Sequence, residues 1–328
     1  MTPLRRRPFL LGAAAAAPFA ARDAAAQPGW APDRPVRLVV PFPAGTSTDI
    51  IGRMIAAQLS KGLGGATVVV DNRAGAGGTI GALHVAQSPP DGTVLLLSTI
   101  GTHAVNPHLM PGLQYDPFRD FTPIMAHSAT RILLVVRPQL GPRSVAEFVA
   151  LARTRQLSIA SPGTGTTGHL AHALLTLATR VETVHVPYRD GGRAVTDLLS
   201  GTLDAMFYHT QFVRPHIEAG TMLGLGITGT GRSDVLPQVP SFAEAGLPQV
   251  DVIGWWALHG PAGLPAPVAQ RVTAVLNAAL EEAETRTIFA RNGLEKLGGD
   301  GAALLAFQHR EYDRWGDVVR RARMTAEG

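Results

Sequence analysis

The residues best suited to chemistry gather in loops that follow predicted strands. The first loop, residues 41–49, combines Gly45 with a series of hydroxyl and carboxyl side chains that can cap a helix. Unpaired amides at the start of that helix would attract a carboxylate or a phosphate. The loop therefore predicts an anion site, although an ordinary capped turn between a strand and a helix would have the same sequence features.

A second loop, residues 163–168, has the sequence GTGTTG, which matches the GxGxxG pattern of dinucleotide-binding proteins. That pattern also requires an acidic residue about 20 positions further on, at the end of the next strand. Glu182 has nearly this spacing, but it lies where the next strand begins. The same glycines and hydroxyls could instead hold a small anion without a nucleotide.

A third polar segment, residues 98–103, ends another predicted strand and contains two hydroxyl groups and His103. Histidines more often make structural hydrogen bonds than ligand contacts, so Ser98 is the preferred site residue here. Asp204 begins a strand that could reach the same region. Asp197, by contrast, fits a solvated or capping role.

The catalytic motifs that we searched for are absent from the sequence. The chain contains no GxSxG motif, no HExxH motif and no cysteine, which excludes disulfides and cysteine nucleophiles. His169 and His172 are spaced to share a metal on a predicted helix, but no carboxylate accompanies them, so a structural pair is favoured. Trp255 and Trp256 fit a buried hinge pair better than a stacking platform. We therefore expect no catalysis, no metal and no cofactor.

The elements that must position these loops are short β-rich runs alternating with helix-like segments. The predicted strands are residues 36–40, 68–70, 94–97, 157–160, 183–186 and 205–208. The predicted helices are residues 49–59, 80–86, 169–178, 193–199, 267–284 and 302–323. This alternation predicts an α/β fold with a parallel sheet.

The length and composition favour two lobes. The chain has 328 residues, of which 45% are hydrophobic and 16% charged, enough for two domains with their own cores. A change in composition near residues 132–136 separates two α/β units. We predict one lobe from residues 27–130 and 252–328, and a second from 131–251, with the last two helices packing back on the first. Ligands of open α/β sheets bind outside the carboxyl ends of the strands, so the loops should face a shared cleft.

The N-terminus carries much of the positive charge. Arg5, Arg6 and Arg7 precede an apolar run at residues 9–21 and small residues at 24–26, which predicts a cleaved export signal over residues 1–26. The run is shorter than the roughly 20 residues that cross a membrane, and it fits the twin-arginine route or ordinary secretion. Its removal lowers the formal charge from +4 to +1, because four Arg and one Asp are lost. The expected location is the periplasm, and no nucleic-acid partner is expected.

Longer segments stand in a recognisable order along the chain: VVPFPAG, VVVDNRAGAGGTIGA, SPPDGT, SPGTGTTGHL, HVPYRDGGRAVTDLLSGTLDAMF and LPQVPSFAEAGLP. With Asp49, Arg53, residues 102–107 and the pair Gly254-Trp255, this order resembles the Bug family of periplasmic solute-binding proteins. Members of that family are receptors associated with tripartite tricarboxylate transporters. The resemblance extends from about residue 30 to residue 320.

The resemblance implies a type II periplasmic binding protein fold, two α/β lobes that close on a small organic acid, aromatic acid or amino acid. It also implies that loops 42–49 and 161–169 hold the ligand carboxylate through amides and hydroxyls, partly by way of ordered water. Together with the strand ends, this gives the predicted ligand-binding residues: Phe42, Ala44, Gly45, Thr46, Ser47, Asp49, Ser98, Ser161, Thr164, Gly165, Thr166, His169, Tyr188 and Asp204.

Several residues depart from the family pattern. Thr46 stands where a second glycine is usual, which stiffens the first loop and adds a hydroxyl. Ala74 replaces a common Pro, Thr93 a common Tyr, and Asp190 and Arg193 a Gly and a Pro beside the cleft. Arg193 could supply a cation to a dicarboxylate, although a solvated surface position is the alternative.

The expected protein is a soluble, monomeric, exported receptor. It would capture a small carboxylate by lobe closure and present it to an integral membrane transporter. Two alternatives stay open: an NAD-linked or hydrolytic enzyme that uses loop 163–168, and a ligand-sensing adaptor for a sensor kinase.

Overall fold

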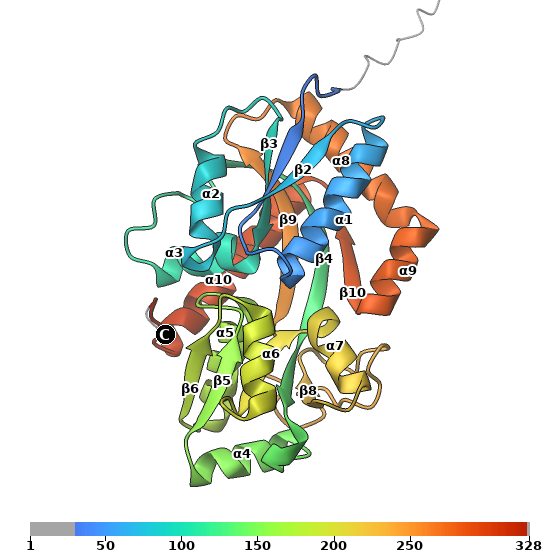
Figure 1. Ribbon diagram of the computed structural model, residues 1–328. Coiled ribbons are helices and arrows are strands. Elements are labelled where there is room, and N and C mark those ends of the chain that lie inside the picture. Colours follow the sequence, from blue (N-terminus) through green and yellow to red (C-terminus); the bar gives the residue numbers. More distant parts are fainter. Residues whose placement is uncertain (1–29, 327–328) are drawn as a thin grey trace, which may run out of the picture.

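The computed structural model describes residues 30–326 and consists of two α/β lobes connected by a long central strand (Figure 1). The upper lobe contains strands β1 (Val36–Val40), β2 (Val68–Asn72), β3 (Val94–Thr99), β9 (Ile253–Pro261) and β10 (Leu294–Gly298). The lower lobe contains β5 (Leu157–Ser161), β6 (Thr183–Pro187), β7 (Ala205–His209) and β8 (Leu223–Ile227). The predicted export signal lies outside the described residues.

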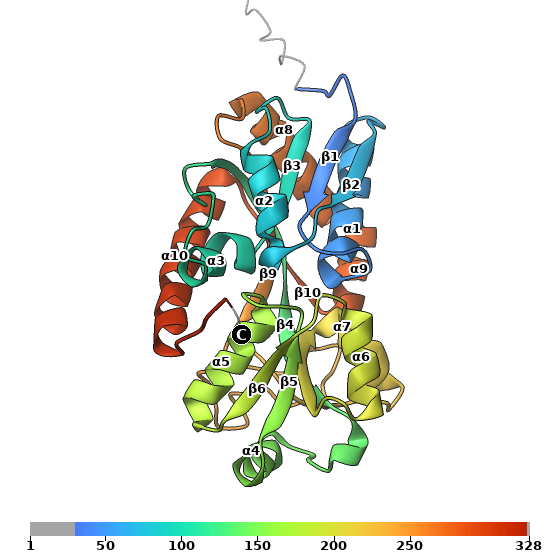
Figure 2. The same cartoon turned by 60° about the vertical axis from the view of Figure 1, so that its left-hand side comes forward.

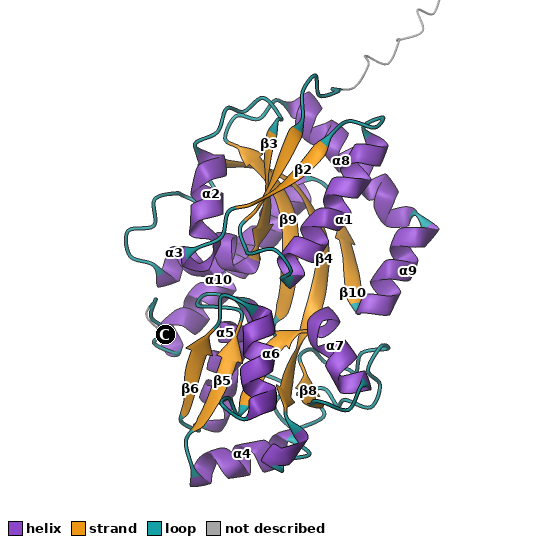
Figure 3. Ribbon diagram, in the orientation of Figure 1, coloured by secondary structure: helices purple, strands orange, loops and turns teal. Residues whose placement is uncertain are grey.

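Helices lie on both sides of each sheet (Figure 3). Those of the upper lobe are α1 (Ser47–Gly62), α2 (Thr79–Ala86), α3 (Asn106–Leu109), α8 (Ala266–Glu281), α9 (Ala283–Asn292) and α10 (Gly301–Arg321). Those of the lower lobe are α4 (Val145–Thr154), α5 (Thr167–Thr179), α6 (Gly191–Ser200) and α7 (Thr210–Glu218). Short helical turns at Ala76–Gly78, Gly101–Val105 and Pro138–Leu140 complete the helical elements of this part of the chain.

Strand β4 (Phe121–Val136) belongs to both sheets. As far as Arg131 it pairs antiparallel with β9 in the upper sheet, and from Ile132 it pairs antiparallel with β7 and β8 in the lower one. Strand β9 begins at Ile253 in the upper sheet. The lobe boundaries expected at 130/131 and 251/252 stay a prediction, and they lie next to these two points.

The sheets are mixed, not purely parallel as the sequence suggested. Strand β1 runs parallel to β2 and β3, and β5 runs parallel to β6 and β7, as the alternating pattern predicts. The antiparallel strands β4, β8, β9 and β10 were not predicted. Strands β4 and β9 are buried along most of their length, so their sequences lack the alternation that marks a half-exposed strand. The helix expected at 267–284 ends at Glu281, where Glu282 leaves the helical conformation (ψ 138°).

The last helices contact elements of both lobes. Helix α8 contacts α1 and β4, and α10 contacts β4 but also α5 of the lower lobe. One hydrophobic cluster accordingly contains residues from both lobes, among them Leu170 of α5, Trp255 of β9 and Trp315 of α10. Figure 2 shows α10 along one side of the upper lobe, with its lower end beside α5 of the lower lobe.

Within the shared cluster, Glu311 of α10 accepts hydrogen bonds from two buried indoles, Nε1 of Trp315 at 2.8 Å and Nε1 of Trp255 at 3.0 Å. We expect Glu311→Ala to lower the free energy of unfolding by about 2–4 kcal/mol, because each buried donor left without a partner costs about 1–3 kcal/mol. The control Asp317→Ala removes exposed ion pairs of the same helix and should cost at most about 0.5 kcal/mol. Urea denaturation measures both, and equal losses would contradict the assignment.

Candidate functional site

The loop between β1 and α1 leaves amides of the helix without acceptors. Thr46 is the N-cap residue: its Oγ1 accepts from the Asp49 amide at 3.4 Å and donates to the Pro43 carbonyl at 2.7 Å. No acceptor among the described residues meets the amides of Ser47 and Thr48. These first amides carry the positive end of the helix dipole, equivalent to roughly half an elementary charge.

Asp49 holds this loop together from the inside. Its carboxylate accepts from the Gly45 amide at 2.9 Å, from Nδ2 of Asn72 at 2.9 Å and from Nε of Arg53 at 3.0 Å. Burial alone would raise the pKa of Asp49, but these hydrogen bonds and the Arg53 charge together lower it. Asp49 therefore stays ionised and is fully engaged with protein groups.

The loop between β5 and α5 repeats the arrangement with other side chains. Thr166 is the N-cap residue, but its hydroxyl donates to the Gly163 carbonyl at 2.6 Å and caps no amide of α5. Nδ1 of His169 accepts from the Gly165 amide at 3.2 Å, just as Asp49 accepts from Gly45 four residues earlier in the first loop. No acceptor among the described residues meets the amides of Thr167 and Gly168.

Neutral histidines support this second loop. The ring of His169 stacks on that of His185, with centroids 3.8 Å apart, and Nε2 of His185 lies 2.6 Å from Oγ of Ser161. Burial lowers the pKa of His169 to about 3 and that of His185 to about 2, and the neighbouring imidazoles add to the shift. The loop is thus fixed without adding a formal charge.

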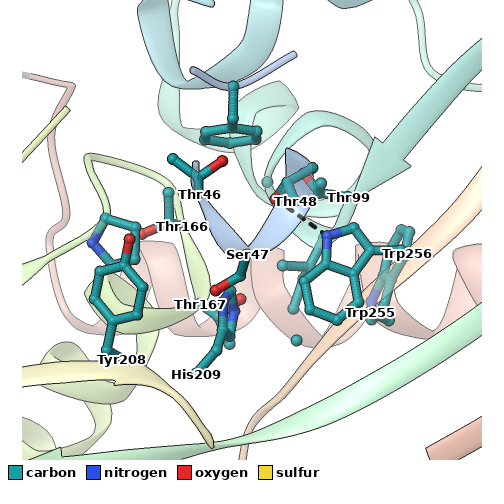
Figure 4. A pocket seen from close by; sticks show the side chains of 15 residues that line it. Thr46, Ser47, Thr48, Thr99, Thr166, Thr167, Tyr208, His209, Trp255 and Trp256 are labelled. Carbon is teal, nitrogen blue, oxygen red and sulfur yellow. Dashed lines mark hydrogen bonds between the residues drawn. The ribbon is translucent and has the colours of Figure 1, made fainter. Parts of the chain in front are cut away.

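The two helix ends meet in a small pocket between the lobes, here called the deep pocket (Figure 4). It is lined by Phe42, Thr46, Ser47, Thr48, Thr99, Ile100, Gly101, Pro162, Thr166, Thr167, Tyr208, His209, Gly254, Trp255 and Trp256. Its free volume is about 30 Å³, room for about two water molecules or a group of similar size. None of the residues that line it carries a formal charge at neutral pH.

Two side chains of the deep pocket have buried polar atoms without partners among the described residues, Ser47 and His209. The unpaired atoms are Oγ of Ser47 and both ring nitrogens of His209. Burial lowers the pKa of His209 to about 4, so its imidazole is neutral and offers one donor and one acceptor. By contrast, Nε1 of Trp256 in the same pocket already donates to Oγ1 of Thr48 at 3.1 Å. The pocket therefore presents hydrogen-bonding groups that only a ligand or water can satisfy.

A wider cavity of about 470 Å³ adjoins the deep pocket and shares Phe42 and Pro162 with it. We call it the outer pocket; its other lining residues are Pro43, Ala74, Gly75, Ala76, Gly77, Gly78, Met110, Gly163, Thr164, Pro187, Tyr188, Arg189 and Ala326. Together the two pockets form a cleft that can take a small head group at its inner end and a larger body outside.

The lobes touch beside the deep pocket through residues without side chains. A Cβ on Gly101 would lie 3.0 Å from the Gly165 carbonyl oxygen, and a Cβ on Gly165 would overlap Oδ1 of Asn106. Gly165 also has φ +74°, in the left-handed region that glycine favours. The structure is therefore closed around the deep pocket, and these glycines permit the close approach.

The predicted site residues take different places in the structure. Phe42, Thr46, Ser47 and Thr166 line the deep pocket, and Phe42, Thr164 and Tyr188 line the outer one. Gly45, Asp49, Ser161, Gly165 and His169 line neither pocket but make the hydrogen bonds that shape the two loops. Ala44 is exposed at the tip of the first loop.

For Ser98 and Asp204 the geometry corrects the prediction. Ser98 is fully buried, and its Oγ contacts the Ala257 carbonyl at 3.0 Å and Nδ1 of His259 at 2.8 Å. Asp204 precedes β7, at the end of the strand away from the pocket, where it pairs with Arg155 at 2.7 Å and Ser158. Both side chains face their own lobe. For Ser98 the reason is that successive residues of a strand point to opposite faces. For Asp204 it is that only the carboxyl end of β7 reaches the cleft.

Important lining residues were missed or assigned only a structural role from sequence. His209 ends β7, so the strand-end rule that selected the other loops could have found it. Trp255 and Trp256, expected as a buried hinge pair, are 1% exposed and also form the inner wall. They lie on β9, which was not predicted as a strand, so their approach to the cleft could not be inferred.

Three further findings concern Arg193, metal binding and membrane-spanning helices. Arg193, considered as a cation for the ligand, pairs with Asp197 at 3.1 Å and lines neither pocket. In the described part of the chain no cluster of His, Asp and Glu could hold a metal ion. Over the same residues, no helix is both long and apolar enough to span a bilayer.

Two α/β lobes with a polar cleft between them define a periplasmic binding protein fold. Residues 51–324 match the profile of the tripartite tricarboxylate transporter family receptor. A UPF0065 protein of Pseudomonas sp. strain P51 is 37% identical over 90% of this chain and 88% of its own length. Protein BugT of Bordetella pertussis is 34% identical over 88% of this chain and 89% of its own. The chain belongs to this receptor family.

Solved structures agree with this assignment. Rpa4515 of Rhodopseudomonas palustris, solved with adipate, has a TM-score of 0.86 at 33% identity, covering 90% of this chain and 99% of that one. MatC of the same species, solved with bound malate, has a TM-score of 0.81 at 33% identity, covering 88% and 99%. The periplasmic binding protein BugD gives 0.84 at 30% identity, covering 90% and 99%.

We expect Asp49→Asn to lower the free energy of unfolding at pH 7 by about 2 kcal/mol, because hydrogen bonds to a charged acceptor are lost. The folded-state pKa of Asp49 lies below its ordinary value of 3.8, so the stabilisation is complete above that value and is lost as the pH falls through the lowered one. The difference between wild type and variant should therefore close in acid. Denaturation at several pH values measures it, with Asp313→Asn, an exposed residue of α10, as control. A difference that does not change with pH would contradict the role of the charge.

Proposed function

We propose that the protein is a solute-binding receptor that captures a small carboxylate in the deep pocket by closure of its two lobes. The observation that carries the proposal is the convergence of two helix N-termini, α1 from the upper lobe and α5 from the lower, on one small cavity. Membership in a receptor family supports the general role, and the neighbours solved with adipate and malate support the ligand class.

The chemistry of the deep pocket favours an anion over a cation or a neutral molecule. Ser47, Thr48 and Thr167 line the pocket with amides that meet no acceptor among the described residues, and each helix end adds roughly half a positive charge. A carboxylate fits the free volume, and it accepts several hydrogen bonds at once. The neutral imidazole of His209 and the hydroxyl of Ser47 would supply further donors at the same place.

Closure follows from the way the site is divided between the lobes. Ser47 belongs to the upper lobe, whereas Thr167 and His209 belong to the lower one, so an open form can satisfy only part of the carboxylate. A ligand that contacts both lobes binds the closed form more tightly and shifts the equilibrium toward it. The closed form is then the state that a partner can recognise.

The arrangement gives little support to an enzyme. Gly165 of the GxGxxG loop is in close contact with Asn106 and Gly101 of the other lobe. Glu182 precedes β6 and lies beside the start of β5, because Leu157 pairs with Thr183 in the parallel register. Glu182 thus lies at the opposite end of these strands from residues 163–168. We propose a receptor without catalytic activity, exported to the periplasm, monomeric, and delivering its ligand to membrane transporter subunits.

Calorimetry with a panel of mono- and dicarboxylates, aromatic acids included, tests the proposal. We expect at least one carboxylate to bind with micromolar affinity, about −8 kcal/mol. Ser47→Ala should weaken that affinity about tenfold, or about 1.4 kcal/mol, without reducing stability, because Oγ of Ser47 has no partner among the described residues. Ser60→Ala, near the far end of the same helix, should leave affinity unchanged. No binding across the panel, or full affinity in Ser47→Ala, would refute the proposal.

Closure makes a separate prediction. Gly165→Ala introduces a Cβ that overlaps Asn106 of the opposite lobe, so the variant should bind the carboxylate at least about tenfold more weakly. Gly112→Ala is the matched control, because Gly112 has φ +85° but open space around it. Both variants place an alanine at positive φ, so the affinity of Gly112→Ala shows the effect of that backbone strain alone. Wild-type affinity in Gly165→Ala would show that contact between the lobes is not needed for binding.

A further inference from the structure

Asn106 of the upper lobe lies against Gly165 of the lower lobe, next to the deep pocket. It is the first residue of α3, it is fully buried, and it lines neither pocket. A Cβ on Gly165 would overlap Oδ1 of Asn106. In the glycine a Cα hydrogen takes the place of that Cβ, so the oxygen meets a C–H group there and not an N–H or O–H group.

The two polar atoms of the Asn106 side chain have different surroundings. Nδ2 donates to the Gly77 carbonyl at 2.9 Å, a contact within the upper lobe. Oδ1 is buried and meets no donor among the described residues. Exchanging the two atoms would place oxygen against oxygen, so their assignment follows from chemistry. An asparagine at the start of a helix commonly caps it, but α3 has no side-chain cap. The side chain is thus held with its acceptor facing the other lobe.

The neighbouring contacts between the lobes have the same character. A Cβ on Gly101 would lie 3.0 Å from the Gly165 carbonyl oxygen, and one on Gly77 would lie 2.9 Å from the Thr164 carbonyl oxygen. Each oxygen therefore faces a glycine Cα across the boundary of the lobes. Contacts between a Cα hydrogen and an oxygen are weaker than ordinary hydrogen bonds. Closure thus exchanges hydrogen bonds with water for weaker contacts at this place.

We propose that Asn106 limits the affinity of the receptor, because closure buries its Oδ1 without a donor. When the lobes are apart, Gly165 no longer covers Oδ1 and water can donate to it. When they close, that donor is lost, and a buried polar group without a partner costs more free energy than an ordinary hydrogen bond contributes. No ligand in either pocket can replace the donor, since Asn106 lines neither. The contacts of the ligand must offset this cost, which lowers the apparent affinity.

The inference rests on the proposed function, because it takes the lobes to open and close around a ligand, and it predicts a gain of affinity. Asn106→Ala removes Oδ1, whereas the loss of a supporting side chain would weaken binding. Its lost bond to Gly77 lies within one lobe and affects unfolding more than closure. Calorimetry with butyrate, succinate, adipate and benzoate should show that the acids that bind the wild type bind Asn106→Ala about tenfold more tightly.

Asn277→Ala is the matched control. Asn277 of α8 also bonds a glycine, through Nδ2 to the Gly299 carbonyl at 2.8 Å and through Oδ1 to its amide at 3.2 Å, and it lines neither pocket. Its Oδ1 has a donor within the same lobe, so Asn277→Ala should leave the affinity unchanged.

A double variant tests whether the contact with Gly165 is responsible. Gly165→Ala should weaken binding because its Cβ overlaps Asn106. In an Asn106→Ala background that overlap is gone, so the same change should cost at least about threefold less affinity. A purely structural role of Asn106 would leave the two losses equal.

Closure is also measured without a ligand. The chain has no cysteine, so Ala74→Cys and Arg189→Cys, exposed positions that line the outer pocket from opposite lobes, can be joined by a short bifunctional thiol reagent. The rate of joining rises with the fraction of closed molecules. We expect Asn106→Ala to raise this rate at least about threefold in the ligand-free protein.

Unchanged or weaker affinity in Asn106→Ala overturns the inference and leaves the proposed function intact, and so do equal losses from Gly165→Ala in the two backgrounds. The proposed function fails in a different way, through the absence of binding by any acid to the wild type. Cross-linking then decides the inference alone: equal rates with and without Asn106→Ala refute it, and a faster rate in the variant supports it.

Discussion

The pairing of β4 with strands of both lobes is the constraint on which the rest of the structure depends. One strand pairs with β9 as far as Arg131 and with β7 and β8 from Ile132 onward. Each sheet is thereby fixed in direction relative to the other, and the loops after β1 and β5 meet between them. If the two sheets shared no strand, the free amides of α1 and α5 would have no reason to converge on one pocket.

The two loops that meet are built on the same plan although their sequences differ. In each, a glycine amide donates to the side chain four residues later, Gly45 to Asp49 and Gly165 to His169, and the N-cap threonine donates to a carbonyl three residues earlier. Asp49 and His169, the ionisable side chains of these loops, thus hold the backbone in place. What remains for a ligand is a set of amides, the hydroxyl of Ser47 and the imidazole of His209.

The difference between side chains that shape the loops and groups that face the ligand explains how much of the site could be predicted from sequence. The parallel strands β1, β2, β3, β5, β6 and β7 and both loops were predicted, since short apolar runs followed by glycine and hydroxyl residues have a clear local signature. Whether Asp49 points into the cleft or back at its own loop depends on Asn72 and Gly45, which local sequence does not place. Ser98 and Asp204 were wrongly assigned to the cleft, because local sequence does not show which way a side chain points either. Trp255 and Trp256 were missed as pocket residues because β9 is buried on both faces and carries no periodic pattern.

The neutrality of the deep pocket also bears on how the protein responds to its medium. Dissolved salt weakens attraction between exposed charges that lie farther apart than about 8–10 Å at ordinary ionic strength, but it acts far less on buried groups. A carboxylate enclosed by amide dipoles, Ser47 and His209 would be shielded from mobile ions once the lobes have closed. Retention of the ligand should then vary little between dilute and saline solutions.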